Sequence, residues 1–246
     1  MNLTENNVVF SKIRTKEMPY GQDIFLTKKY SFNKKNIMNG LELLKNIRPN
    51  SIPVVFFDPQ YRGVLDKLGY GNEGKRQIKR SQLTQMDEKT IINFIKSINK
   101  VLMETGHLFL WVDKFHLCQG IAPWIRGTDL TIVDMIVWDK VRMGMGYRTR
   151  KQTEYLLVLQ KPPIKVKNIW KTRNIRDVWL EKIDNKVHPH QKPHNLQSAL
   201  IEAVTNEGDV VLDPAAGSFS VMDCAMSKKR LFLGCDLEDV ENNGIN

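Results

Sequence analysis

The segment Val210-Val211-Leu212-Asp213-Pro214-Ala215-Ala216-Gly217-Ser218-Phe219-Ser220 consists of an apolar run, a turn of small residues and the beginning of a helical pattern. This order predicts a strand, a tight turn and a helix. A turn of small residues lets a ligand approach the backbone, and the start of a helix offers N–H groups that lack partners within the helix. The segment is therefore typical of a cofactor-binding turn.

A second apolar run ends in an acidic residue about 20 residues after the turn, where dinucleotide-binding folds place a carboxylate that holds ribose hydroxyls. The run covers residues 231–235, and the acid is Asp236. The turn, the spacing and the acid together indicate a cofactor site, although an ordinary turn with a capping aspartate would show the same residues. The turn matches neither the G-x-G-x-x-G nor the G-x-x-x-x-G-K-S/T pattern, which disfavours dinucleotide and nucleoside triphosphate sites.

Apolar runs alternate with helical patterns over the rest of the chain. We expect strands at 36–38, 53–57, 107–112, 131–138, 154–160, 209–212 and 231–235, and helices at 40–47, 87–103, 115–126, 194–206 and 219–227. Seven strands that alternate with helices predict an α/β, doubly wound, Rossmann-like sheet. Residues 62–85 are polar and rich in glycine, and we expect them to form a basic loop.

Composition and charge limit the class of protein. The chain has 246 residues, of which 41% are hydrophobic and 26% are charged, so it suits one large domain or one domain with a small insert. Its formal net charge is +10. A domain this basic usually meets a polyanion, most often nucleic acid, but solubility or a lysine-rich compositional bias would give the same charge.

The three cysteines, Cys118, Cys224 and Cys235, are far apart and odd in number. They form neither a zinc pattern nor a disulfide framework, which predicts a reduced, cytoplasmic protein without a metal site. The first ten residues lack the pattern of a signal peptide, and every apolar run is too short to cross a bilayer. We therefore expect no membrane association.

A second candidate site follows the apolar run 53–57, in the tetrapeptide Asp58-Pro59-Gln60-Tyr61. The carboxyl end of a strand is where α/β folds bind ligands. The exocyclic amine of a nucleobase is a poor nucleophile because its lone pair is delocalised into the ring. A carboxylate and a carbonyl that accept its two N–H bonds would free that lone pair, and an aromatic ring would hold the flipped base. Asp58, the carbonyl of Pro59 and Tyr61 suit these tasks, although a strand-end turn with a capping aspartate is the alternative.

A third motif, His188-Pro189-His190-Gln191-Lys192-Pro193, precedes the predicted helix 194–206. Two histidines two positions apart, without a nearby cysteine or carboxylate, make a poor metal site. We interpret the motif as a rigid loop beside the cofactor pocket, and a plain turn between two parts of the fold is the alternative.

Together, these motifs resemble the S-adenosylmethionine-dependent amino-methyltransferases of DNA, which modify adenine N6 or cytosine N4. They match the permuted subgroup in which the catalytic motif precedes the cofactor motif. That family has Asp-Pro-Pro-Tyr, then His-Pro-Thr-Gln-Lys-Pro, then Asp-Pro-Phe-x-Gly-Ser-Gly-Thr, and the counterparts here are residues 58–61, 188–193 and 213–220. The resemblance covers about residues 36–236 and implies a mostly parallel, seven-stranded methyltransferase sheet with a small target-recognition insert.

The resemblance implies that the chain binds S-adenosylmethionine and methylates the N6 amine of adenine in double-stranded DNA after base flipping. It implies catalysis by Asp58, Pro59, Gln60 and Tyr61. Asn39 stands where the family has an aspartate that meets the adenine of the cofactor. The cofactor-binding residues that the resemblance implies are Asn39, Asp58, His188, His190, Gln191, Lys192, Asp213, Ala215, Gly217, Ser218 and Asp236.

Three residues depart from the family pattern. Gln60 replaces the second proline of the catalytic motif, Ala215 replaces a phenylalanine, and Phe219 replaces a glycine. We expect Phe219 to crowd the start of the helix that follows the cofactor turn.

The resemblance also divides the chain into an extension (1–35), a catalytic half (36–161), a target-recognition insert (162–187) and a cofactor half (188–246). The insert is basic and aromatic and coincides with the family's variable segment. Because the chain is short, we expect a homodimer or a short target, and a cognate restriction endonuclease as a further partner. The residues expected to contact DNA are Lys75, Arg76, Lys79, Arg80, Arg148, Arg150, Arg173 and Arg176.

Several functional hypotheses remain open at this point. An aspartate at the first position of the catalytic motif, here Asp58, favours adenine N6 over cytosine N4, for which serine is usual in the family. Methylation of RNA or of a protein glutamine would use the same chemistry, but glutamine methylation favours asparagine at this position. A catalytically silent nucleic-acid-binding module is the third hypothesis, because Gln60 and Phe219 depart from the family pattern.

Overall fold

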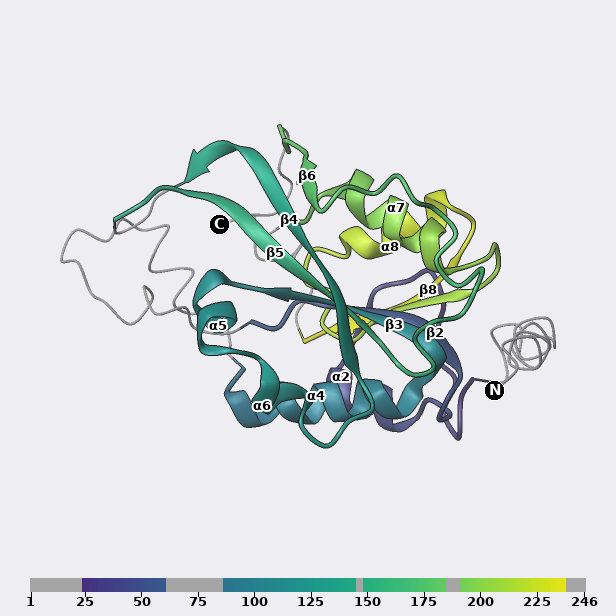
Figure 1. The fold of residues 1–246 in the computed structure, drawn as a ribbon. Helices are drawn as coiled ribbons and strands as arrows, with labels where there is room; N and C mark the ends of the chain where they lie inside the picture. Colours follow the sequence, from purple (N-terminus) through teal and green to yellow (C-terminus); the bar gives the residue numbers. More distant parts are fainter. Residues whose placement is uncertain (1–23, 61–85, 145–147, 185–190, 238–246) are drawn as a thin grey trace, which may run out of the picture.

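The computed structural model describes residues 24–60, 86–144, 148–184 and 191–237. Within this part of the chain, one mixed sheet of eight strands lies between two groups of helices (Figure 1). The strands are β1 (Asn36–Ile37), β2 (Ile52–Phe57), β3 (Leu102–Val112), β4 (Thr131–Gly144), β5 (Lys151–Gln160), β6 (Val178–Leu180), β7 (Val210–Asp213) and β8 (Leu231–Asp236). The helices are α2 (Gly40–Lys45), α4 (Glu88–Val101), α5 (Lys114–Gln119), α6 (Ala122–Ile125), α7 (His194–Val204) and α8 (Ser220–Ser227).

The strand order is β1-β8-β7-β2-β3-β5-β4-β6. Neighbours from β1 to β3 pair in parallel, β5 is antiparallel to both β3 and β4, and β6 is parallel to β4. The predicted α/β, mostly parallel, doubly wound sheet is therefore confirmed. The predicted number of strands is wrong, since the sheet has eight. The eighth, β6, has three residues and forms by pairing with β4, so sequence periodicity could not reveal it.

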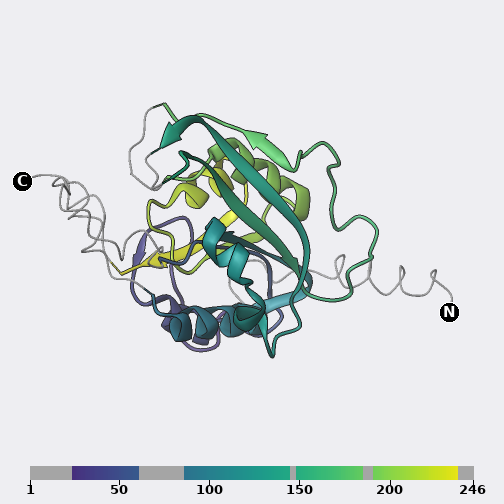
Figure 2. The same ribbon diagram turned by 60° about the vertical axis from the view of Figure 1, so that its left-hand side comes forward.

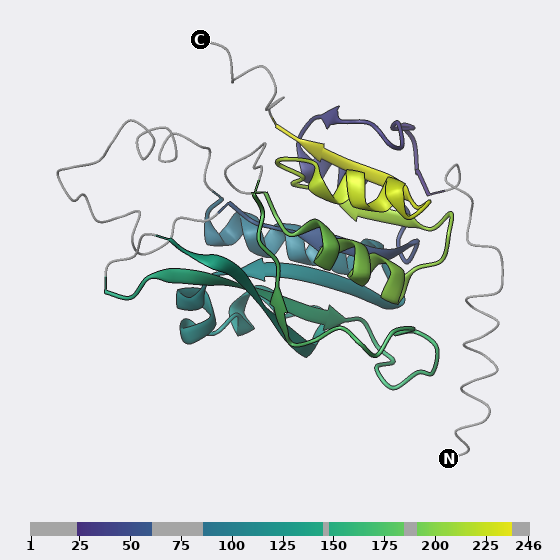
Figure 3. The same ribbon diagram turned by 90° about the horizontal axis from the view of Figure 1, so that it is seen from above.

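The core consists of two apolar layers, one on each face of the sheet. Val55 and Phe57 of β2 pack in the layer with α2 and α4, whereas Val54 and Phe56 pack in the layer with α7 and α8. Figure 3 shows α7 and α8, in green and yellow, in front of the sheet. All six residues of β2 are buried because helices cover both faces. A continuous apolar run such as residues 53–57 is the sequence pattern of such a strand.

The predicted boundaries before β3 are wrong. The helix predicted to reach residue 103 ends at Val101, and β3 begins at once with Leu102 rather than at residue 107. Leu102 pairs with Ile52 of β2, so a contact with a distant strand overrides the local helical pattern. The single helix predicted at 115–126 is two helices, α5 and α6, which separate at Gly120, where the backbone has φ 85°.

The β4–β5 hairpin is longer than predicted and extends past the end of the sheet (Figures 1 and 2). Tyr155 of β5 pairs with Val112 at the carboxyl end of β3, and the pairing with β4 continues beyond that point to Gly144 and Lys151. The amide of Gln152 donates to the carboxylate of Asp139 across the hairpin, at 2.9 and 3.0 Å. The hairpin thus projects from the edge of the sheet where β2, β3 and β7 end.

Candidate active site

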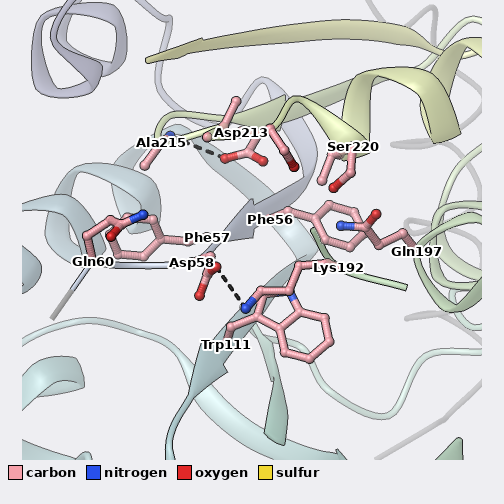
Figure 4. A pocket seen from close by; sticks show the side chains of 14 residues that line it. Phe56, Phe57, Asp58, Gln60, Trp111, Lys192, Gln197, Asp213, Ala215 and Ser220 are labelled. Carbon is pink, nitrogen blue, oxygen red and sulfur yellow. Dashed lines mark hydrogen bonds and ion pairs between the residues drawn. The ribbon is translucent and has the colours of Figure 1, made fainter. Parts of the chain in front are cut away.

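The fold brings the two predicted motifs together at one edge of the sheet. β2 lies beside β7, with Val55 opposite Leu212, so Asp58 and Asp213 follow neighbouring parallel strands. A pocket opens between them (Figure 4). Its lining residues are Phe56, Phe57, Asp58, Gln60, Trp111, Lys192, Gln197, Asp213, Ala215, Ala216, Gly217, Ser218, Ser220 and Val221.

Backbone N–H groups and two carboxylates organise the loop after β7. Asp213 Oδ1 accepts a hydrogen bond from the Ala215 N–H at 3.2 Å, and Asp236 Oδ2 accepts one from the Gly217 N–H at 2.8 Å. The Ala216 N–H donates to the carbonyl of Cys235 at 2.9 Å. Burial raises the pKa of Asp213 well above its ordinary value, while the bond from Ala215 opposes this shift. The acid at the end of β8 therefore lies against the turn, as its spacing predicts.

Gly217 gives the loop an open side. Its backbone is left-handed, with φ 50°, and an added Cβ would meet no atom within 4 Å. Ala215, Ala216, Gly217 and Ser218 all line the pocket, so the backbone there is accessible to a ligand. This accessible backbone, with the Asp236 carboxylate beside it, fits the ribose and the amino acid part of S-adenosylmethionine.

Phe219 shows why the family has glycine at its position. It has a left-handed backbone, with φ 56° and ψ 24°, immediately before α8. Its ring does not block the helix start, because it is buried against Phe232 with 6.2 Å between ring centroids. The ammonium group of Lys35 lies 5.7 Å from the centroid of the Phe219 ring. The expected crowding is thus replaced by a strained backbone with a well-packed side chain.

Asn39 lies at the edge of the sheet that bears the pocket, and its side chain caps helix α2. It follows β1, whose Ile37 pairs with Asp236, and it caps α2 by accepting the Leu41 N–H at 2.8 Å. The next residue, Gly40, packs so closely that an added Cβ would lie 1.9 Å from the carbonyl oxygen of Pro214. The start of α2 is therefore held against the cofactor turn, and the side-chain oxygen of Asn39 accepts a capping bond there.

A chain of four charged side chains runs from the pocket into the β4–β5 hairpin. The ammonium group of Lys192 lies 2.8 Å from Asp58 Oδ2 and 2.9 Å from Glu154 Oε2. Glu154 Oε1 also pairs with Lys140 at 2.6 Å. Figure 4 shows the Lys192 ammonium directed at Asp58, beside the ring of Trp111, whose centroid is 4.8 Å away. Lys192 thus links the predicted catalytic acid to a second carboxylate.

Burial and these ion pairs shift the pKa values of Asp58, Glu154 and Lys192. Burial raises the pKa of Asp58 above its ordinary value, and the Lys192 ammonium partly offsets this increase. Burial also disfavours the charged forms of Glu154 and Lys192. The ammonium groups of Lys192 and Lys140 nevertheless hold the pKa of Glu154 below its ordinary value. Asp58 and Glu154 in turn raise the pKa of Lys192. The Lys192 ammonium therefore favours the ionised form of Asp58, which burial opposes.

Sequence reasoning missed three residues near Asp58. Glu154 was identified only as the start of a strand, Trp111 as part of an apolar run, and Gln197 as a helix residue. Trp111 and Gln197 are buried, at 2% and 1% exposure, and both line the pocket. Buried charged or amide side chains on strands and helices indicate such sites, but burial itself becomes visible only in the fold.

Other predicted site residues lie outside the described part of the chain or near its limits. Tyr61, His188 and His190 are outside the described residues. Gln191 is within them, and its Nε2 lies 3.1 Å from His194 Nε2 at the start of α7. Also outside are four of the predicted DNA contacts, namely Lys75, Arg76, Lys79 and Arg80.

The remaining predicted DNA contacts are exposed but lie in different places. Arg148 and Arg150 adjoin the tip of the β4–β5 hairpin, beyond the carboxyl end of β3. Arg173 and Arg176 lie between β6 and Lys171, whose N–H donates to the carbonyl of Ala203 near the end of α7. That helix begins at the pocket and ends at the opposite edge of the sheet. The first half of the predicted insert is therefore distant from Asp58.

Among the described residues, no group of three or more His, Cys, Asp or Glu side chains could hold a metal ion. Nor does any described helix have the length and apolar character needed to cross a membrane.

Residues 52–243 match the model of a family described as DNA methylase, the N6/N4 methylases. This match covers more than half of the chain. The chain belongs to the N6/N4 DNA methylase family. It is an enzyme, a DNA methyltransferase that uses S-adenosylmethionine as its methyl donor.

Relatives of this DNA methylase include type II methyltransferases. It is 54% identical over 207 residues to the type II methyltransferase M.HhaII of Haemophilus parahaemolyticus, which covers 83% of this chain and 91% of the relative. It is 26% identical to the type II methyltransferase M2.DpnII of Streptococcus pneumoniae over 92% of this chain and 93% of the relative.

Solved structures share the fold of this methylase. The cytosine-N4-specific PvuII DNA methyltransferase matches with a TM-score of 0.65 at 16% identity, over 85% of this chain and 83% of that one. The complex of M1.HpyAVI with S-adenosylmethionine matches with a TM-score of 0.58 at 19% identity, over 83% of this chain and 93% of that one. At these identities the structures support the Rossmann-like methyltransferase sheet and leave the target base open.

Proposed function

We propose that this DNA methylase transfers a methyl group to the N6 amine of adenine within a short DNA sequence, after flipping the base into the pocket. The observation on which this rests is that Asp58 and the cofactor turn line one pocket. A DNA base must leave the helix to reach such a pocket. The aspartate at the first position of the motif favours adenine, whereas a serine would favour cytosine N4.

In this proposal Asp58 and Pro59 activate the amine. A carboxylate oxygen of Asp58 accepts one amine N–H and the carbonyl of Pro59 accepts the other, which directs the nitrogen lone pair towards the methyl group. Proline has a fixed φ, so the direction of its carbonyl is set before the base arrives. Gln60 lines the pocket next to them and offers an amide to the substrate, and Tyr61 is proposed to stack on the base.

S-adenosylmethionine supplies the methyl group on a positively charged sulfur, so its transfer to the amine nitrogen breaks the sulfur–carbon bond and releases one proton and S-adenosylhomocysteine. The turn after β7 is proposed to hold the donor, with Asp236 accepting hydrogen bonds from ribose hydroxyls. Asn39, Asp213, Ala215, Gly217, Ser218 and the loop residues His188, His190 and Gln191 are proposed to complete this binding site.

Four further features belong to the same proposal. The designation of the relatives as type II methyltransferases supports a restriction endonuclease with the same target. The apolar residues Val178 and Leu180 are exposed on the edge strand β6, which supports a homodimer. All three cysteines are free thiols, which supports a cytoplasmic location. The position of β2 before β7 in the chain favours the permuted subgroup.

The test compares the protein with its Asp58→Ala variant on duplex DNA, followed by digestion to nucleosides and mass spectrometry. We expect N6-methyladenine from the unaltered protein and a loss of turnover of at least about 100-fold in the variant, the order found when one preorganised polar group is removed from an active site. Glu207→Ala is the control, because Glu207 pairs with Lys229 on the exposed surface. N4-methylcytosine as the sole product would refute the choice of base.

Calorimetry with S-adenosylmethionine separates the two halves of the pocket. Asp58→Ala should bind the donor as the unaltered protein does, whereas Asp236→Ala should bind it about 10-fold more weakly, since it loses a charged hydrogen-bond acceptor. Equal loss of donor binding in both variants would mean that Asp58 is structural.

A further inference from the structure

Lys192 lies where two parts of the molecule meet. It precedes α7, and its side chain is only 12% exposed between Asp58 at the end of β2 and Glu154 on β5. Two ammonium groups, Lys192 and Lys140, balance the two carboxylates. A buried ammonium held at two oxygens and against an aromatic face has little freedom to reorient.

The charged groups that face Asp58 come from every element around it. Lys192 approaches from the segment before α7, Glu154 from β5 with Lys140 of β4 behind it, and Asp213 from β7. Of these, Lys192 is the one that bonds to the Asp58 carboxylate directly. Its removal would leave Asp58 among carboxylates without its cation.

We propose that Lys192 is a positioning residue for Asp58, and that Glu154 and Lys140 hold the Lys192 ammonium in place. This inference rests on the proposed function, because it assumes that Asp58 meets the target amine. The bond from Lys192 to Oδ2 restricts the rotation of the Asp58 carboxylate and leaves Oδ1 as the oxygen that accepts the amine N–H. Lys192 therefore acts on the reaction through Asp58, in place of the direct role at the cofactor that the family resemblance implies.

The proposal predicts a shift in the pH dependence of turnover. An ionised carboxylate accepts the amine N–H, so activity falls as pH decreases through the pKa of Asp58. Lys192 lowers that pKa against the effect of burial, and Glu154 raises it. Removing Lys192 should therefore move the acid limb of the kcat profile to higher pH, whereas removing the charge of Glu154 should move it to lower pH.

The experiment measures kcat against pH and the Kd for S-adenosylmethionine in Lys192→Met, Lys192→Arg and Glu154→Gln, with Lys229→Met as the control from the exposed surface. We expect Lys192→Met to lose about 10- to 100-fold in kcat, as for one charged hydrogen bond, with donor binding retained. Lys192→Arg keeps the charge, so its acid limb should stay near that of the unaltered protein even if Lys192→Met fails to fold.

The acid limbs decide the inference. If Lys192→Met weakens donor binding at least about 10-fold and leaves the acid limb in place, Lys192 is a cofactor ligand and the proposal is wrong. The proposal is also wrong if Lys192→Met and Glu154→Gln shift the limb in the same direction, or if Lys192→Arg moves it as far as Lys192→Met does. A failure of the proposed function can be distinguished from a failure of this inference, because Asp58→Ala would then keep its turnover.

Discussion

Phe219 combines a strained backbone with a buried ring. A left-handed conformation costs about 1 kcal/mol or more for a residue with a Cβ, and glycine avoids this cost. Loss of a buried phenylalanine ring costs about 3–5 kcal/mol. The ring therefore outweighs the strain, which explains why the chain tolerates phenylalanine where its family has glycine.

We predict that Phe219→Gly is more stable than Phe219→Ala by about 1 kcal/mol, because both variants lose the ring and the glycine alone loses the strain. Urea unfolding of the two variants measures this difference. At Phe232, which lies in the extended strand β8, the order should reverse, with alanine the more stable. An alanine variant at 219 as stable as the glycine variant would show that the left-handed backbone is unstrained.

Single residues were predictable where a motif fixes both their type and their position. Asp58 follows β2, and Asp213 and Asp236 end β7 and β8. These three strands are neighbours in the parallel part of the sheet, so the strand pattern alone places the three acids at one edge. Glu154 and Trp111 could not be assigned in this way. Their proximity to Asp58 depends on how β5 and β3 pair, and no spacing along the chain contains that information.

At the scale of elements, we propose that the β4–β5 hairpin is the part of the described chain that meets DNA. It projects from the edge that bears the pocket, and Arg148 and Arg150 adjoin its tip. Arg173 and Arg176, by contrast, follow the anchor of Lys171 at the end of α7. The family resemblance located the main DNA contacts in residues 162–187, whereas the fold favours the hairpin for contacts near the flipped base.

We therefore predict that Arg148→Ala with Arg150→Ala weakens DNA binding about 10-fold or more at low salt and decreases the salt slope by about 2, one for each lost phosphate contact. The matched double variant of Arg173 and Arg176 should have the smaller effect. Fluorescence anisotropy with a labelled duplex measures both. A larger effect from the Arg173 and Arg176 variant would mean that residues 162–187 make the main DNA contacts.

Elements with their own periodicity were predicted, and those that depend on pairing were not. The apolar face of α4 has Ile91, Ile95 and Ile98 buried as its spacing requires. β6 and the first residues of β3 become strands through partners far away in sequence. The β4–β5 hairpin is likewise longer than predicted because its two strands continue to pair with each other as far as Gly144 and Lys151.

For the molecule as a whole, the net charge of +10 has two interpretations, and the salt dependence of DNA binding separates them. If the charge serves DNA, each phosphate contact releases counterions, and about four contacts would weaken binding roughly 100-fold between 50 and 200 mM salt. If it serves solubility, affinity should hardly change over that range. We expect the steep dependence, because basic residues adjoin the edge where Asp58 and the cofactor turn meet. Binding curves for a nonspecific duplex at four or more salt concentrations measure the slope of log affinity against log salt concentration. A slope smaller than that of about one phosphate contact would mean that the charge serves solubility and that uncharged groups bind the target.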